Sequence, residues 1–163
     1  MKGNQKGFTL IELIVVVAIV GILAAVTGVS VSTVSSTQNR KCAASIDSML
    51  SQCRVLTLSG ADSPVLKLHV ERDGCYGTIE CGGVSRAQER LGPPQTAITF
   101  TADDVDYNLS DTALYLAFDR TTGALRSLDE VSGNTASGSC TEIGVGSYTL
   151  ALTPSTGYHT LVS

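Results

Sequence analysis

Apolar residues along the chain first form one uninterrupted run. It extends from Phe8 to Val29, and Glu12 is the only charged residue within it. As a helix, these 22 residues would be about 33 Å long, which is enough to cross a hydrocarbon core of roughly 30 Å. Lys2 and Lys6 precede the run, so we expect a membrane span whose N-terminus stays in the cytoplasm and whose remaining chain is exported.

Beyond this run, apolar residues recur in steps of three and four, which is the spacing of one helix face. We therefore expect the helix to continue over residues 30–59, to about Ser59, just before Gly60. This apolar stripe should pack against a globular head formed by residues 60–163. The stripe consists of Cys42, Ile46, Met49, Leu50, Cys53 and Leu56.

The pattern within the head is mostly that of short strands and turns. One segment, 85–91, is instead expected to form a short helix that is stopped by Gly92-Pro93-Pro94, and 133–140 has the composition of a loop. The predicted fold class is α+β, with a long N-terminal helix packed on an antiparallel β-sheet head. The expected strands are 66–71 before a turn at Asp73-Gly74, 97–101, a hairpin over 113–128 and a second hairpin over 147–162.

The chain contains five cysteines and no C-x-x-C pair, which favours disulfides over metal ligands. Disulfides persist in oxidising compartments outside the cytoplasm. Cys42 and Cys53 share a helix face but lie about 16 Å apart along the axis, so they cannot bond to each other. Our preferred set is Cys75–Cys81 and Cys53–Cys140 with Cys42 left over. Other pairings and a fully reduced, buried set remain open.

Glu12 is the most informative residue of the apolar run. A charge at the centre of a membrane helix costs about 2.5–3.5 kcal/mol on insertion scales, and such a residue needs a partner. Lys6 does not share its helix face. A cut after Gly7 would instead create an amine on Phe8, one turn from Glu12, that could pair within the chain or with the Glu12 of a neighbouring subunit.

The stretch KGFTLIELIVVVAIVGILAA resembles the N-terminal signature of type IV prepilins and pseudopilins. The resemblance implies that residues 1–7 form a leader, that prepilin peptidase cuts after Gly7, and that Phe8 is methylated. It also implies that Glu12 recruits each subunit into a helical filament of homologous subunits through an inner-membrane assembly platform. The chain would contact the lipid of the cytoplasmic membrane before assembly. It would then move to a surface filament or an envelope-spanning pseudopilus.

Small residues recur along the same run, and they let membrane helices approach closely. Ordinary membrane-helix composition explains them equally well. One departure from many major pilins is that no proline precedes Pro64, so the usual marker of local helix melting is missing. The candidate helix-packing residues are Ala18, Gly21, Ala25 and Gly28.

The sequence offers little evidence of an enzyme. His69 and His159 lie in strand-like segments without a partner motif, and no nucleophile-elbow, zinc-protease or phosphate-loop motif occurs. We expect neither catalysis nor a cofactor. The net charge of −4 and the dispersed arginines make no strong case for nucleic-acid binding.

An acidic segment over 103–111 is the one candidate for a metal site. Asp104, Asp106 and Asn108 have the alternating oxygen ligands of a calcium loop. The sixth position is Leu109 instead of Gly, however, and the twelfth is Tyr115 instead of Glu. A solvated acidic loop is the better interpretation, and we expect no metal.

The function expected from these features is that of a structural subunit of a type IV pilus or related filament. Two alternatives remain open. One is a minor pilin or pseudopilin of a type II secretion or DNA-uptake system, and the other is a membrane-tethered binding module that does not polymerise. Adhesion, motility, secretion and DNA uptake all use this kind of N-terminus, so the sequence does not distinguish among them.

Overall fold

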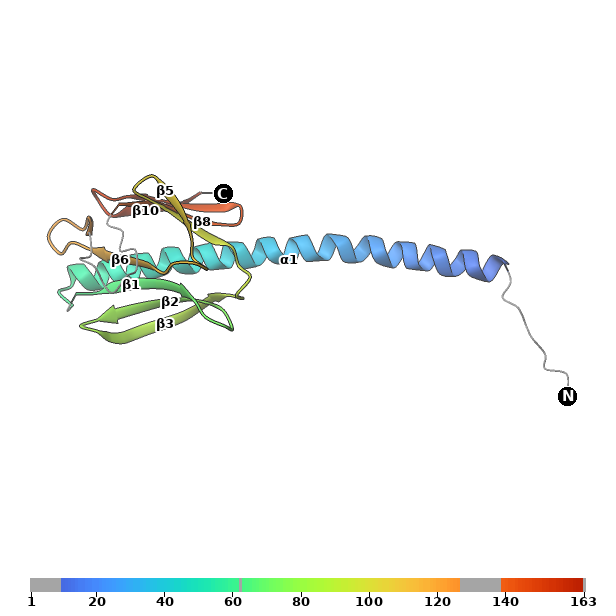
Figure 1. Ribbon diagram of the computed structural model, residues 1–163, viewed down its shortest axis with the longest axis horizontal. Helices are drawn as coiled ribbons and strands as arrows, with labels where there is room; N and C mark the ends of the chain where they lie inside the picture. The colour runs from blue at the N-terminus through green and yellow to red at the C-terminus, as the bar shows by residue number, and fades with distance from the viewer. Residues whose placement is uncertain (1–9, 62, 127–138, 163) are drawn as a thin grey trace. The chain divides into compact units, whose positions relative to one another are not determined.

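The computed structural model describes residues 10–61, 63–126 and 139–162, without the side chains of residues 25–34. The chain divides into two units, residues 1–35 and residues 36–163. A single helix, α1 (Leu10–Leu58), belongs to both units, and all strands belong to the second (Figure 1). The fold class is α+β with antiparallel pairing, as predicted, but α1 packs against two sheets where a single sheet was predicted.

The end of α1 is fixed by local backbone chemistry. Gly60 adopts a φ of +90°, a conformation that costs a glycine little. The amide of Gly60 donates to the carbonyl of Thr57, and the amide of Ala61 donates to that of Leu56. This is the Schellman arrangement, which satisfies the last carbonyls of a helix. The helix therefore ends one residue before the predicted Ser59.

The strands form two five-stranded antiparallel sheets, which we call sheet A and sheet B. Sheet A has the order β3-β2-β1-β6-β7, and sheet B has the order β10-β9-β8-β4-β5. The strands of sheet A are β1 (Val65–Val70), β2 (Cys75–Cys81), β3 (Val84–Gly92), β6 (Leu114–Phe118) and β7 (Leu125–Arg126). The strands of sheet B are β4 (Ile98–Ala102), β5 (Val105–Asn108), β8 (Cys140–Val145), β9 (Tyr148–Thr153) and β10 (Tyr158–Val162).

Both sheets contact the second half of α1 (Figure 1). On sheet A, a Cβ built on Gly77 would lie 2.5 Å from the Sδ atom of Met49, so β2 packs directly on the helix. On sheet B, His159 of β10 contacts Ser51. The predicted stripe is the centre of this core, since Cys42, Ile46, Met49, Leu50 and Cys53 are buried and Leu56 is partly buried against them.

The predicted strands and hairpins are confirmed, whereas the predicted helix over 85–91 is wrong. That segment lies within β3, which pairs with β2 along its length. It has no apolar alternation because β3 is an edge strand whose residues are mostly exposed, and pairing with β2 outweighs the helix propensity of the segment. Strands β2, β5 and β8 were not among the predicted elements. Most of the predicted loop 133–140 lies outside the described residues, and Cys140 begins β8.

The turn between β6 and β7 is held by one carboxylate. Asp119 Oδ1 accepts hydrogen bonds from the amides of Thr121 and Thr122 at 2.9 and 2.8 Å, and from both of their hydroxyls. These hydrogen bonds, that of the Thr121 hydroxyl first, hold the pKa of Asp119 well below its usual range. The ionised carboxylate therefore stabilises this turn.

We predict that Leu50→Ala lowers the free energy of unfolding by about 2–5 kcal/mol, because it leaves a cavity between α1 and the sheets. Leu50 is fully buried in the head core. Val55→Ala on the same helix is the matched control, since Val55 is 64% exposed, and its effect should stay within about 0.5 kcal/mol. Urea unfolding of the full chain in detergent, followed by circular dichroism, measures both. Equal effects would contradict the packing described here.

We also predict that Asp119→Asn lowers the Tm at pH 7, because the ionised acceptor of the turn is lost. The folded-state pKa lies below the ordinary value of 3.8, so this stabilisation is present above pH 3.8 and is lost as the pH falls toward the folded-state pKa. The difference in Tm between the variant and the parent should therefore narrow below pH 3.8. Asp111→Asn is the control. Asp111 is an exposed aspartate whose Oδ1 atom accepts from the Ser110 hydroxyl at 3.1 Å and does not hold the β6–β7 turn. A pH-independent difference would refute this account.

Candidate functional site

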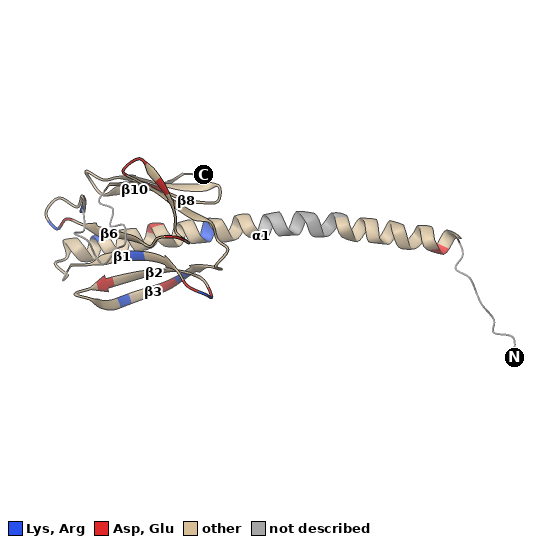
Figure 2. Ribbon diagram, in the orientation of Figure 1, with Lys and Arg blue, Asp and Glu red and all other residues tan. Residues whose placement is uncertain are grey.

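The first described part of α1 presents an unusually apolar surface. Every large aliphatic side chain from Leu10 to Leu23 is exposed by 51–77% in the isolated chain. Glu12 lies in the first turn, is exposed, and is the only charged residue between Leu10 and Ala24 (Figure 2). Apolar surface of this extent marks a segment that contacts lipid or other proteins.

The predicted processing residues, Gly7 and Phe8, lie outside the described residues. Among the candidate packing residues, Ala18 and Gly21 are exposed on α1, and a Cβ on Gly21 would meet no atom within 4 Å. Ala25 and Gly28 lie on α1 as well, where only the backbone is described.

None of the described residues belongs to a helical stretch that is both long enough and apolar enough to cross a membrane.

The five cysteines are all free and buried in this structure, and the predicted Cys75–Cys81 disulfide is wrong. These two residues lie at opposite ends of β2, about 20 Å apart at 3.3 Å per residue. A disulfide requires Cα atoms within about 7 Å. The predicted Cys53–Cys140 pair is not formed either. The thiol of Cys140 instead lies 3.6 Å from the carbonyl of Glu142 on β8.

His159 contacts both a serine and an aspartate, but not in the arrangement of a catalytic triad. Its Nε2 atom lies 3.0 Å from Ser51 Oγ and 3.7 Å from Asp47 Oδ1. Its Nδ1 atom lies 3.4 Å from the carbonyl of Gly157. A triad needs the serine and the carboxylate on different ring nitrogens. The contact therefore joins β10 to α1.

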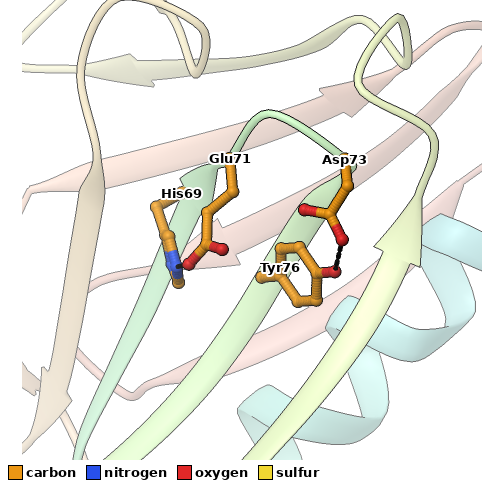
Figure 3. Close-up of polar contacts among 4 residues, drawn as sticks. All are labelled: His69, Glu71, Asp73 and Tyr76. Atoms are coloured by element: carbon orange, nitrogen blue, oxygen red, sulfur yellow. Dashed lines mark hydrogen bonds and ion pairs between the residues drawn. The ribbon is translucent and has the colours of Figure 1, made fainter.

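A second polar cluster lies at the β1–β2 hairpin (Figure 3). His69 Nε2 is 3.0 Å from Glu71 Oε1, and the hydroxyl of Tyr76 donates to Asp73 Oδ2 at 2.8 Å. The hydrogen bond to Asp73 is the main cause that raises the pKa of Tyr76. Arg90 of β3 donates to the carbonyl of Asp73, so the cluster fixes the predicted Asp73-Gly74 turn.

The acidic segment 103–111 comprises the β4–β5 turn at Asp103 and Asp104, the strand β5, and the residues that follow β5. Asp106 Oδ1 accepts from the hydroxyl of Thr101 at 2.7 Å, and Asn108 Oδ1 accepts from the amide of Ser110 at 3.1 Å. Asp104, the other weak metal candidate, has a φ of +61° in the turn. Across the part of the chain that the structure describes, no three His, Cys, Asp or Glu residues gather in a way that could hold a metal ion.

Sequence reasoning missed one cleft of about 360 Å³ beside the C-terminal end of α1. The guanidinium of Arg120 lies against Gly60, and Arg126 and Asp119 also line the cleft. No motif marks it, because its walls come from the helix end and from the β6–β7 hairpin, which are distant in sequence. The one feature of the sequence that points to this cleft is the turn segment DRTTG, which contributes Asp119 and Arg120 to its wall.

The comparisons with known proteins bear on the N-terminal segment alone. The family model described as the prokaryotic N-terminal methylation motif matches residues 2–28. The comparison with curated proteins finds no match, and the comparison with solved structures finds none either. The matched range contains Gly7, Phe8 and Glu12, together with the exposed apolar part of α1. The match supports a type IV pilin-like prepilin that carries a class III signal peptide.

Proposed function

We propose that this chain is a structural subunit of a type IV pilus or related filament. It is inserted in the cytoplasmic membrane with its N-terminus inside, is cut by prepilin peptidase after Gly7 and is methylated on Phe8. It then polymerises with homologous subunits through the N-terminal part of α1. The observation that carries this proposal is the match of residues 2–28 to the methylation motif, a range that contains Gly7 and the exposed apolar start of α1.

The surface of the helix supports assembly through this segment. Eleven large aliphatic side chains between Leu10 and Leu23 are exposed in the isolated chain. Such a surface is stable in lipid before assembly and against neighbouring helices afterwards. Ala18 and Gly21, with Ala25 and Gly28 further along, carry little or no side chain, which allows helix backbones to approach closely.

Glu12 gives the assembly its axial register in this proposal. A carboxylate in apolar surroundings is stabilised by a nearby cation. The amine that cleavage creates on Phe8 is such a cation, four residues away along the sequence. When the amine of one subunit reaches the Glu12 of the next, the pair fixes how far one helix is shifted along the other.

The second candidate is a minor pilin or pseudopilin of a secretion or DNA-uptake system. The observation that favours it is the lack of any proline before Pro64, since many major pilins carry a proline within the apolar segment. A tethered module that never polymerises is the third candidate. Sheared surface filaments separate them, because a major subunit is abundant there, a minor one is present in trace amounts and a tethered module is missing. We propose no enzymatic activity for any of the three.

We predict that Gly7→Val blocks processing, because the branched side chain occupies the position before the cut. Intact mass and N-terminal analysis of the membrane fraction should give a chain that starts at Met1, whereas the parent chain starts at methylated Phe8. Gly3→Val is the matched control in the same leader and should leave processing intact. A parent chain that starts at Met1 would remove the prepilin interpretation.

We predict that Glu12→Gln reduces the protein in sheared filaments by about tenfold or more relative to the membrane fraction. A hydrogen bond to a charged group is worth about 1.5–3 kcal/mol, and about 1.4 kcal/mol is a factor of ten. Glu142→Gln, a change of an exposed acid on β8, should leave the ratio unchanged. Quantitative immunoblotting of both fractions checks this, and normal incorporation of Glu12→Gln would refute the assembly role.

A further inference from the structure

Four of the five buried cysteines lie on two faces that pack against each other. Cys42 and Cys53 belong to the buried stripe of α1. Cys75 and Cys81 are the first and last residues of β2, and both point to the same side of the strand because side chains alternate. Gly77 lies on that side as well, and it contacts Met49. The cysteine-bearing face of β2 is therefore the face that covers α1.

Along this contact, the two cysteines of α1 and the two cysteines of β2 lie on either side of one shared point. Met49 lies between the two helix cysteines in sequence, and its partner Gly77 lies between the two strand cysteines. Cys42 and Cys53 are about 16 Å apart along a helix axis, and Cys75 and Cys81 are about 20 Å apart along a strand. The two pairs thus span comparable total lengths, and the Met49–Gly77 contact lies between the two ends of each span.

The groups around Cys53 and Cys42 indicate which cysteine of α1 lies near which cysteine of β2. The buried thiol of Cys53 contacts the backbone of Leu66, and Leu66 is the β1 residue paired with Ile79, next to the Cys81 end of β2. Burial first, and then the nearby thiol of Cys81, raises the pKa of Cys53 to about 12. Burial, and then the nearby thiol of Cys75, likewise raises the pKa of Cys42 to about 12. Each helix thiol therefore has one strand thiol within electrostatic range, Cys75 for Cys42 and Cys81 for Cys53.

We propose that Cys42–Cys75 and Cys53–Cys81 are disulfide bonds in the mature exported protein, and that Cys140 stays a free thiol. The proposal rests on the proposed function, because export brings the head into an oxidising compartment. Cys140 lies on β8 of sheet B, where it pairs in register with Ala102 and its thiol contacts the carbonyl of Glu142, and we assign it no partner. The two bonds fasten the helix that enters the filament to sheet A at two levels.

The chemistry is thiol–disulfide exchange with a disulfide oxidant of the envelope. For each bond, two cysteine thiols lose two protons and two electrons and form one S–S bond. The oxidant's disulfide takes them up and leaves as two thiols. The thiolate is the attacking species, so thiols with a pKa of about 12 react slowly once they are buried. The bonds therefore form during folding, before the helix and β2 close over them. Formation replaces the weak contact of the Cys75 thiol with the carbonyl of Pro93, at 3.5 Å.

The first experiment maps the bonds in the full chain taken from cells. Sheared filaments and membranes are dissolved in denaturant with iodoacetamide and digested with trypsin without reduction. Cleavage at Lys41, Arg54, Arg72 and Arg86 should leave peptide 42–54 linked to peptide 73–86. Cleavage before Asp47 and after Glu80 then separates the bonds. We expect fragment 42–46 linked to 73–80 and fragment 47–54 linked to 81–86, with alkylated Cys140.

Crossed links, a link to Cys140, or alkylation of all five cysteines in a chain that starts at Phe8 would overturn the disulfides and leave the filament proposal intact. A chain that starts at Met1 with all five cysteines alkylated would overturn both. The intact mass of the same sample shows the N-terminus, so the two failures are distinguishable.

The second experiment tests whether the fold itself selects these two disulfides, independently of the cellular compartment in which the protein folds. The full chain is reduced, unfolded and refolded into detergent with a mixture of oxidised and reduced glutathione, and then mapped in the same way. Cys140→Ala should give the same two links. Cys75→Ala should lose only the link to Cys42, and Cys81→Ala should lose only the link to Cys53. Retention of the Cys53 link in Cys81→Ala, or free thiols throughout in the parent chain, would refute the register.

Discussion

The packing of one helix face against two sheets is the interaction on which the head depends. Sheets A and B share no strand, and each would leave an apolar face exposed without α1. Met49 contacts β2, Ser51 contacts His159 of β10, and Leu50 between them is fully buried. The helix thus supplies the centre of a core that neither sheet could form alone.

Apolar residues are distributed differently in the part of α1 that precedes residue 36. There the apolar residues show no stripe, because aliphatic side chains occupy every face of the segment Leu10–Leu23. A helix that is apolar all round requires surroundings that are apolar all round, such as lipid or neighbouring helices. Its one charge, Glu12, is then the feature that can distinguish one axial position of a neighbour from another, since dispersion between aliphatic side chains varies little with a shift along the axis.

Elements with a strong local signal could be predicted from the sequence. The stripe from Cys42 to Leu56, the Gly60 stop and the hairpin at 147–162 each follow from periodicity or backbone preference. β3 could not be predicted, because an exposed edge strand has no apolar alternation and takes its structure from β2. The split into two sheets was also missed, since strand order depends on contacts between distant segments. The proposed cleavage and assembly residues could be named from the sequence alone, because Gly7, Phe8 and Glu12 lie within one contiguous motif.

The cysteines show how a missing element changes a chemical conclusion. Without β2, residues 75–81 look like a small loop, and two cysteines at its ends invite a bond between them. Once the segment is a strand, those cysteines are forced apart, and the length between them becomes comparable to that between Cys42 and Cys53 on the helix. Eleven residues of helix and six residues of strand are therefore matching spacings. This match is visible in the sequence, but it has meaning only when both secondary structures are known, because the rise per residue of a strand is about twice that of a helix.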